Sequence, residues 1–161
     1  MKIYLIRHAH AEERHFFAQT GKHDDQRPLT EKGIDRMNKI IQSFKGNEEN
    51  INLFLQSPLK RAKQTGEVLK DYYPEAQFVT TKNLVPGFNA KKLYDEIQSY
   101  ELDSLGIIGH EPDLGQFLSW MLFRQATDHF PLKKGGIAKL DLYKDGRCYL
   151  KWLIRPKLLI P

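Results

Sequence analysis

Four short apolar runs alternate with segments of helical periodicity, and this alternation constrains the fold more than any other feature of the sequence. The runs span residues 2–7, 51–56, 76–81 and 104–109. In the segments after them, apolar residues recur every three or four positions, which is the spacing of one helix face. They are Ile34, Met37, Ile41 and Phe44, then Leu59, Ala62, Leu69 and Tyr72, then Leu93, Ile97 and Tyr100, and finally Leu114, Phe117, Leu118, Met121 and Leu122. Alternating strands and helices predict an α/β fold with a mostly parallel sheet.

The C-terminal part of the sequence has a different period. Apolar residues alternate with polar ones, first at Ala138, Leu140 and Leu142 and then at Cys148, Leu150, Trp152 and Ile154. Asp145-Gly146 between them is typical of a two-residue hairpin turn. The sequence therefore predicts an antiparallel hairpin at the sheet edge and a three-layer α/β/α architecture. For a length of 161 residues, we expect one domain covering 1–161.

Charge and cysteine content exclude several classes of protein. The net charge is +5, from 25 Lys and Arg and 20 Asp and Glu. The basic residues are scattered and lack the interleaved aromatics of a nucleic-acid module, so we expect a solvated surface or a local anion pocket and no nucleic-acid partner. The single cysteine, Cys148, excludes an internal disulfide. Without a signal-peptide pattern or an apolar run of ~20 residues, we expect a cytoplasmic protein with no membrane contact.

Local signals predict how the helices begin and where the chain is irregular. Thr30 is suited to cap the first long helix. Ser57, followed by a proline, fits an N-cap, although Ser57 could also bind phosphate directly. Asp113, with Gln116 three residues later, forms a variant capping box. Residues 9–28 are polar and irregular, which predicts a long loop.

Basic side chains follow three of the four predicted parallel strands. Arg7 and His8 end the first strand, Arg61 lies one turn into the helix after the second, and His110 follows the fourth. Ligands of open α/β sheets bind beyond the carboxyl ends of the strands, and Arg61 can lean back over its strand end. Four crowded groups of this kind repel each other unless an anion lies between them. The sequence therefore predicts a phosphate site, because the arginine fork suits phosphate oxygens.

A histidine in such a cluster adds chemistry that phosphate binding alone does not require. A neutral imidazole can attack phosphorus and carry the phosphoryl group covalently. The arginines and a second, protonated histidine would hold the three equatorial oxygens as charge shifts. Attack of water on the phosphohistidine would then release inorganic phosphate. The cluster thus predicts a phosphatase.

Three motifs in order resemble the histidine phosphatase superfamily, which has the phosphoglycerate mutase-like fold. They are "LIRHAHA" at 5–11, "SPLKRAKQT" at 57–65 and "IGHEPDL" at 108–114. The short chain, the "RPLTEKG" at 27–33 and the near absence of an inserted cap are similar to the small branch of SixA-type phosphohistidine phosphatases. The resemblance implies that His8 is the phosphate-accepting nucleophile. It also implies that Arg7, Arg61 and His110 complete the phosphate pocket, with no metal and no cofactor.

The sequence departs from the superfamily at the general acid. Many members have a carboxylate after the third strand, where this chain has Asn83, and an amide cannot supply a proton. A substrate with a good leaving group, such as a phosphohistidine, needs less acid help than an alkyl ester. Other carboxylates could replace the missing acid, and the sequence does not choose among them. They are Glu12, Asp24, Asp25 and Glu111.

The expected substrate is therefore a phosphohistidine on a protein, such as a phosphorelay domain, reached through a shallow open pocket. The alternatives are a small phosphorylated molecule or a phosphate-recognition module without turnover. His8 and His10 also have the spacing of a metal pair in amidohydrolase-like barrels. Such barrels have about 250 residues, and this chain has arginines where a metal would need carboxylates. If His8 attacks as a neutral base while His110 is protonated, the rate should have a bell-shaped pH profile.

Overall fold

The computed structural model describes residues 1–46 and 50–160, and these contain one mixed six-stranded sheet. Its strands are β1 (Lys2–Arg7), β2 (Leu53–Gln56), β3 (Gln77–Thr80), β4 (Ser104–Gly109), β5 (Ile137–Leu142) and β6 (Cys148–Ile154). Their order across the sheet is β3-β2-β4-β1-β5-β6. The first four are mutually parallel, and β5 and β6 add an antiparallel edge beside β1. The predicted mostly parallel sheet with a terminal hairpin is confirmed.

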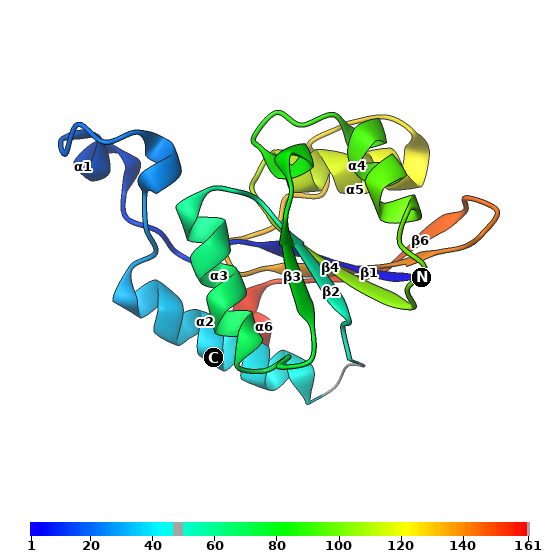
Figure 1. The fold of residues 1–161 in the computed structure, drawn as a ribbon, viewed down its shortest axis with the longest axis horizontal. Coiled ribbons are helices and arrows are strands. Elements are labelled where there is room, and N and C mark those ends of the chain that lie inside the picture. The colour runs from blue at the N-terminus through cyan, green and yellow to red at the C-terminus, as the bar shows by residue number, and fades with distance from the viewer. Residues whose placement is uncertain (47–49, 161) are drawn as a thin grey trace.

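Helices cover both faces of the sheet (Figure 1). The helices are α1 (Arg14–Ala18), α2 (Glu31–Lys45), α3 (Lys60–Lys70), α4 (Ala90–Gln98), α5 (Asp113–Phe123) and α6 (Pro156–Leu159), with 3-10 turns η1 (Asp24–Gln26) and η2 (Lys82–Leu84). Helices α2, α3 and α6 lie on one face, and α4 and α5 lie on the other (Figure 1). This is the predicted three-layer α/β/α arrangement. None of the described helices is long and apolar enough to cross a membrane.

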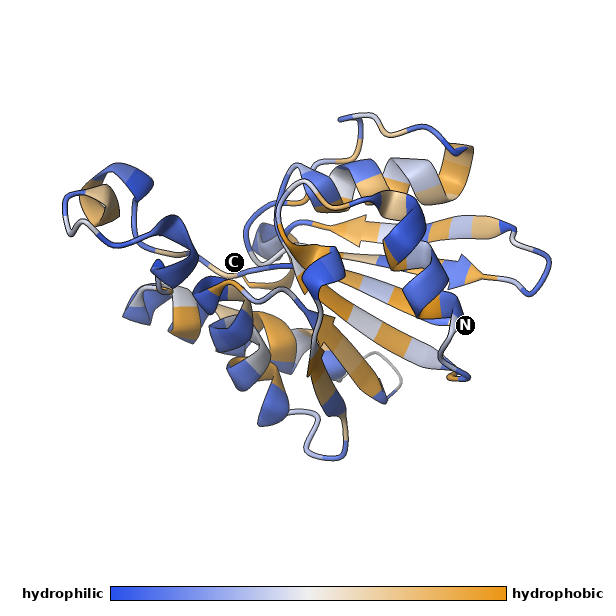
Figure 2. Cartoon of the chain, turned by 45° about the horizontal axis from the view of Figure 1, so that its top comes forward, coloured by the Kyte–Doolittle hydropathy of each residue, from blue (hydrophilic) through white to orange (hydrophobic). Residues whose placement is uncertain are grey.

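Two apolar clusters, one on each side of the sheet, hold the layers together. Strand residues alternate between them, so that Ile3 and Leu5 face α4 and α5, whereas Tyr4 and Ile6 face α2 and α3. Figure 2 shows the apolar character of the strands inside the helical layers. Burial on both faces explains why the strands read as continuous apolar runs in the sequence.

The parallel register brings the functional strand ends together. Arg7 at the end of β1 is paired with Gly109 at the end of β4, and Gln56 at the end of β2 is paired with Ile108. The residues that follow these strands therefore leave the sheet at one edge. The segment containing α1 and η1 stands beyond that edge, away from the body of the fold (Figure 1).

The segment 9–28 is more ordered than the predicted long loop. It contains α1 and η1, and a bridge between Ala11 and Leu29 closes its base. The base is fixed further by α2, because the Thr30 amide donates to the His10 carbonyl and Thr30 Oγ1 caps the helix by accepting from the Gly33 amide at 3.0 Å. A Cβ on Gly33 would lie 2.1 Å from the His10 carbonyl oxygen, so this approach requires glycine.

Three local predictions are wrong because other contacts prevail. Helix α3 begins at Lys60 with Leu59 as its N-cap, so Ser57 lies outside the helix. Asp113 does not form the predicted capping box, since its carboxylate accepts from the Gly87 amide. The hairpin has a three-residue loop rather than a two-residue turn: Tyr143 pairs with Arg147 across it, and Gly146 has a positive φ of 84°.

Candidate active site

His8 is fixed on both sides at the end of β1. Its amide donates to the Gly109 carbonyl at 3.0 Å, which continues the β1–β4 ladder by one residue. Its ring Nδ1 lies 2.7 Å from the Ala9 carbonyl oxygen. A carbonyl oxygen only accepts, so this contact requires a proton on Nδ1 and leaves the lone pair on Nε2. The geometry therefore selects Nε2 as the nucleophilic atom of the neutral ring.

Thr65 joins the segment directly after His8 to α3. Its hydroxyl oxygen accepts from the Ala9 amide at 3.1 Å and donates to the Arg61 carbonyl at 2.8 Å. The residue is fully buried, and no other described side chain bonds to that amide. Thr65 thus sets the path of the chain directly after His8 relative to the helix that supplies Arg61.

His110 faces His8 across the site. The two ring centroids are 5.1 Å apart at an interplanar angle of 54°. His110 Nε2 lies 2.7 Å from Ser57 Oγ, and its Nδ1 is buried without a hydrogen-bond partner among the described residues. Ser57 therefore orients His110, and its hydroxyl oxygen also accepts from the Leu59 amide, just before α3 begins.

Both predicted arginines lie near the histidine pair, and both have unused donors. Arg7 Nη1 donates to the Leu132 carbonyl at 2.8 Å, and Arg61 Nη1 donates to the Asp24 carbonyl at 3.0 Å. The Nε atoms of both are buried with no hydrogen-bond partner in the described part of the chain. Buried, unpaired donors of this kind are uncommon, and an anion's oxygens would satisfy them.

Two residues of the 9–28 segment, Asp24 and Arg27, were not predicted from the sequence to contact Arg61 or each other. The Asp24 carboxylate lies 3.3 Å from Arg61 Nη1 and accepts from Arg27 Nε at 2.8 Å. Arg27 is 7% exposed and also donates to the Glu12 carbonyl. Asp24 was one of four candidate acids, whereas Arg27 was visible only as part of the "RPLTEKG" stretch. Together they place a carboxylate against the proposed phosphate pocket.

Burial and positive charge keep both histidines neutral without ligand. Burial, followed by the charge of His110, lowers the pKa of His8 to about 2. Burial, followed by the charges of Arg61 and Arg7, lowers the pKa of His110 to about 3, although Asp24 opposes this. Such cationic surroundings favour the binding of a dianion. His110 is thus neutral in the free protein, and its predicted protonated form requires bound phosphate.

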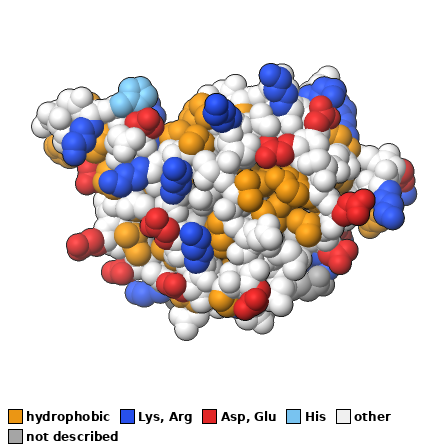
Figure 3. Space-filling model, in the orientation of Figure 1, with side chains coloured by type: hydrophobic (Ala, Val, Ile, Leu, Met, Phe, Trp, Pro, Cys, Tyr) orange, Lys and Arg blue, Asp and Glu red, His pale blue; other side chains and the backbone are white. Residues whose placement is uncertain are grey.

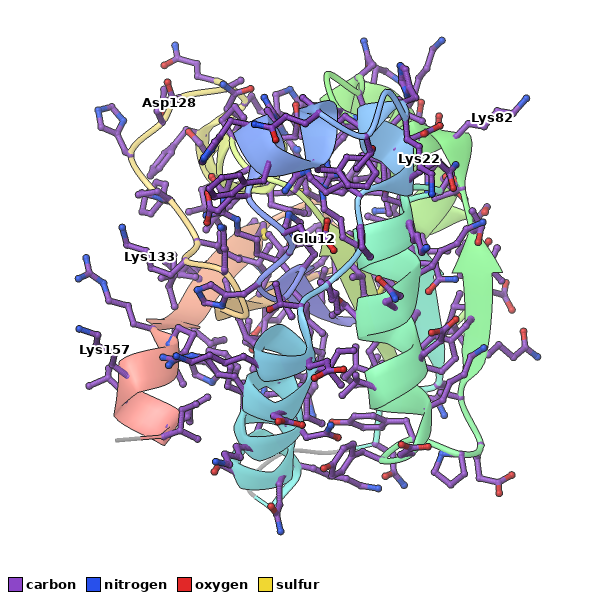
Figure 4. All side chains as sticks on the ribbon, turned by 90° about the vertical axis from the view of Figure 1, so that its left-hand side faces the viewer. Glu12, Lys22, Lys82, Asp128, Lys133 and Lys157 are labelled. Atoms are coloured by element: carbon purple, nitrogen blue, oxygen red, sulfur yellow. The ribbon has the colours of Figure 1, made fainter. Side chains whose placement is uncertain are left out.

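Asn83 and the other candidate acids lie in different surroundings. The side-chain amide of Asn83 donates to the Glu96 carboxylate at 2.7 Å, so the Asn83 side chain is held by α4. The Glu111 carboxylate accepts from the amides of Gly115 and Leu132, which is a structural role. Glu12 is exposed (Figure 4). No group of three or more His, Cys, Asp or Glu in the described residues could hold a metal ion.

The site is more enclosed than the shallow open pocket we expected. His8, Arg61 and His110 are only 5%, 4% and 4% exposed. Asp24 of η1 contacts Arg61. Burial raises the pKa of the Asp24 carboxyl, but the Arg27 hydrogen bond and the charges of nearby arginines lower it by more, so the pKa is lowered overall. In the space-filling view, the segment of α1 and η1 forms a lobe with an indentation between it and the body (Figure 3). Asp24 therefore places a carboxylate of this segment directly against Arg61.

Comparison with known proteins identifies the family and the fold. Residues 3–85 match the model of the histidine phosphatase superfamily (branch 1). An uncharacterized protein of Picosynechococcus sp. is 31% identical over the full length of both chains. The protein histidine phosphatase SixA, solved in complex with tungstate, is 25% identical, with a TM-score of 0.84 over 99% of each chain. The alpha-ribazole phosphatase of Shigella flexneri shares the fold at 14% identity, with a TM-score of 0.72 over 97% of each chain.

Proposed function

The chain belongs to the histidine phosphatase superfamily (branch 1), and we propose that it hydrolyses its substrate through a covalent phosphohistidine on His8. The observation that carries this proposal is the contact between His8 Nδ1 and the Ala9 carbonyl, which leaves the Nε2 lone pair free for attack. His110, at 5.1 Å between ring centroids, and the donors of Arg7 and Arg61 surround the same space. Each residue has a role in the transfer.

In the first step, His8 Nε2 forms a bond to phosphorus as the bond to the leaving group breaks. Arg7 and Arg61 stabilise the oxygens of the transferred group, which gain charge in the transition state. In the second step, water attacks the phosphohistidine, the nitrogen–phosphorus bond breaks, and inorganic phosphate leaves. The electron pair returns to Nε2, so His8 is regenerated as the neutral base.

His110 stabilises the oxygens as a cation once phosphate is bound. Ser57 Oγ holds Nε2, and the unpaired Nδ1 remains for a phosphate oxygen. The dianion opposes the repulsion from the arginines that lowers the pKa of His110 in the free protein. Binding of substrate and uptake of a proton are thereby coupled.

We propose a phosphohistidine on a protein as the substrate. The Asn83 side chain is hydrogen-bonded to Glu96. The pKa of Asp24 is lowered, so its carboxyl is ionised near neutral pH and has no proton to donate. A leaving group that departs without acid help is therefore favoured, and the imidazole of a phosphohistidine is such a group. The likeness to SixA at 25% identity supports the same choice.

A small phosphorylated molecule is the second candidate. The observation that favours it is the burial of His8 and His110, because a small substrate needs less displacement of the 9–28 segment than a protein does. The two candidates share the chemistry at His8 and differ in how the site opens.

Phosphate release tests the proposal. Wild type and His8→Ala are offered a phosphohistidine protein and para-nitrophenyl phosphate, with His129→Ala as the matched control because His129 is exposed. We expect release by wild type and the control, preferably from the phosphohistidine protein, and none by His8→Ala. Preference for the small ester would favour the second candidate. Phosphate binding without release from either substrate would refute the enzymatic function.

A further inference from the structure

A pocket lined almost wholly by cations lies beside the proposed phosphate site. It has a volume of about 450 Å³, and six of its eight lining residues are lysine or arginine. These are Arg7, Arg36, Lys133, Lys134, Arg155 and Lys157. His10 and Pro156 complete the lining, and no Asp or Glu among the described residues contributes to it. We call this feature the basic pocket.

The cations of the basic pocket come from four segments that are distant in the sequence. Arg7 ends β1, Arg36 lies on α2, Lys133 and Lys134 precede β5, and Arg155 and Lys157 flank the start of α6. Lys133 and Lys157 extend from the same side of the molecule (Figure 4). The fold therefore gathers like charges that repel each other, an arrangement that is favourable only when an anion binds there.

Within residues 1–46 and 50–160, five of the six pocket cations have no side-chain partner. Apart from Arg7, none of them forms an ion pair or a side-chain hydrogen bond with another described residue. The Nε of Arg36 is buried without an acceptor, and the same holds for the Nε of Arg7. Carboxylate or phosphate oxygens from a ligand would satisfy both donors.

The basic pocket is continuous with the phosphate site. Arg7 belongs to both, and it donates to the Leu132 carbonyl directly before Lys133. His10 lies two residues after the proposed nucleophile. Partial burial of its ring, followed by the positive charges of Lys134 and Arg36, lowers the pKa of His10, while Glu13 opposes this. A ligand that fills the basic pocket therefore lies next to the group bound at His8.

We propose that the basic pocket binds acidic side chains of the phosphorylated substrate protein that neighbour its phosphohistidine, an inference that rests on the proposed function. Arg36 and Lys134 at the base are half-buried, whereas Lys133, Arg155 and Lys157 at the rim are exposed. Exposed cations at the rim can contact carboxylates of a substrate protein whose main chain stays outside the pocket. Electrostatic complementarity of this kind selects among partners and speeds their encounter.

Binding of two matched peptides tests the proposal. Both carry the same non-hydrolysable phosphohistidine analogue, flanked by glutamates in one and by glutamines in the other. Fluorescence anisotropy at low salt measures their affinity for wild type and for the Lys133→Gln/Arg155→Gln/Lys157→Gln variant. We expect wild type to bind the glutamate peptide about tenfold more tightly, and the variant to bind both peptides within about twofold.

The matched control removes the same charge elsewhere. Lys63→Gln/Lys92→Gln/Lys144→Gln changes three exposed lysines on α3, α4 and the hairpin loop. This control should keep the wild-type preference for the glutamate peptide. Equal affinity of wild type for the two peptides, or an equal loss of preference in the control, would overturn the proposal.

A third arm distinguishes a compact polyanion from an acidic protein segment. If inorganic tripolyphosphate binds wild type more tightly than the glutamate peptide and loses affinity in the pocket variant, the pocket serves a small polyanion and the proposal is wrong. The analogue is not hydrolysed, so these measurements need no turnover. Failure of the proposed function would instead appear as a wild-type protein that releases no phosphate.

Discussion

Asp24 contacts one terminal nitrogen of Arg61 with two of its oxygens. Its carboxylate lies 3.3 Å from Arg61 Nη1, and its backbone carbonyl accepts from the same atom at 3.0 Å. The Arg61 side chain is only 4% exposed, so this pair is shielded from solvent on the arginine side. The proposed phosphate-binding arginine is thus held by an internal anion in the free protein, and we expect the substrate to compete with Asp24.

We predict that Asp24→Asn strengthens anion binding. The amide keeps the shape of Asp24 but removes a negative charge next to Arg61, where charges interact strongly. The affinity for sulfate, measured by calorimetry, should rise about tenfold or more. Asp35→Asn on α2, which is exposed, is the control and should bind like wild type. Unchanged affinity in Asp24→Asn would show that Asp24 does not compete for the site.

Sulfate binding should strengthen as the pH falls. The pKa of His110 is about 3 in the free protein, and a bound dianion raises it, so binding takes up a proton. At pH values between the pKa of His110 in the free protein and its pKa in the complex, the affinity for sulfate increases by up to about tenfold for each unit by which the pH falls. Sulfate remains a dianion over this range, so the dependence comes from the protein. His110→Gln should bind sulfate with a flatter pH dependence, and a flat profile for wild type would contradict the coupling.

The same pKa values revise the expected bell-shaped rate profile. The pKa of His8 is about 2 in the free enzyme, so His8 remains a neutral base throughout the ordinary pH range. The acid limb of kcat/KM that His8 would cause therefore lies below about pH 4. Any loss of activity between pH 5 and 7 must come from another group.

Stability should fall in mild acid because both histidines are buried neutral. Their unfolded pKa is about 6.5 and their folded values are about 2 and about 3. Below pH 6.5 the unfolded state therefore binds protons that the folded state excludes. Between pH 6.5 and 5 the free energy of unfolding should decrease by up to about 2 kcal/mol for each histidine. Urea unfolding at pH 7, 6 and 5 measures this decrease.

Variants assign the acid sensitivity to the two rings. His8→Gln and His110→Gln should each remove about half of the decrease between pH 7 and 5, whereas the exposed His129→Gln should leave it unchanged. Equal slopes in all four proteins would mean that other groups control acid unfolding.

The sequence indicated the fold and the gathering of Arg7, His8 and His110 at one place, because both depend on regular strand ends. Arg7, His8 and His110 follow strands whose apolar runs are unambiguous, and a parallel sheet brings such ends to one edge. Asp24 and Arg27 were harder to place. Their positions depend on how the 9–28 segment folds back onto α3, which no local pattern specifies.

Local rules also failed where a tertiary contact competed with them. Ser57 has the residue type and the following proline of an N-cap, but α3 begins three residues after it and its hydroxyl contacts His110. Asn83 was identified with the position of the missing acid, and only the structure shows that Glu96 holds its side chain. The basic pocket was invisible because Arg36 and Arg155 are far apart in a sequence whose lysines and arginines look evenly scattered.

Thr65 should be a positioning residue for the nucleophile. Thr65→Val keeps the side-chain volume but leaves the buried Ala9 amide without its acceptor. An unsatisfied buried donor costs about 1–3 kcal/mol, so the free energy of unfolding should fall by that amount. Displacement of the neighbouring His8 should also lower kcat/KM about tenfold or more, since small errors in position reduce rates strongly.

A hydroxyl-specific rescue separates this role from simple packing. Thr65→Ser loses a methyl group but keeps the acceptor, so its kcat/KM should be close to that of wild type even if its stability is lower. Thr20→Val, at an exposed threonine of the 9–28 segment, controls for the substitution itself. If Thr65→Ser were as inactive as Thr65→Val, the methyl contact rather than the bond to Ala9 would position His8. If Thr65→Val were fully active, the path of the chain after His8 would not depend on Thr65.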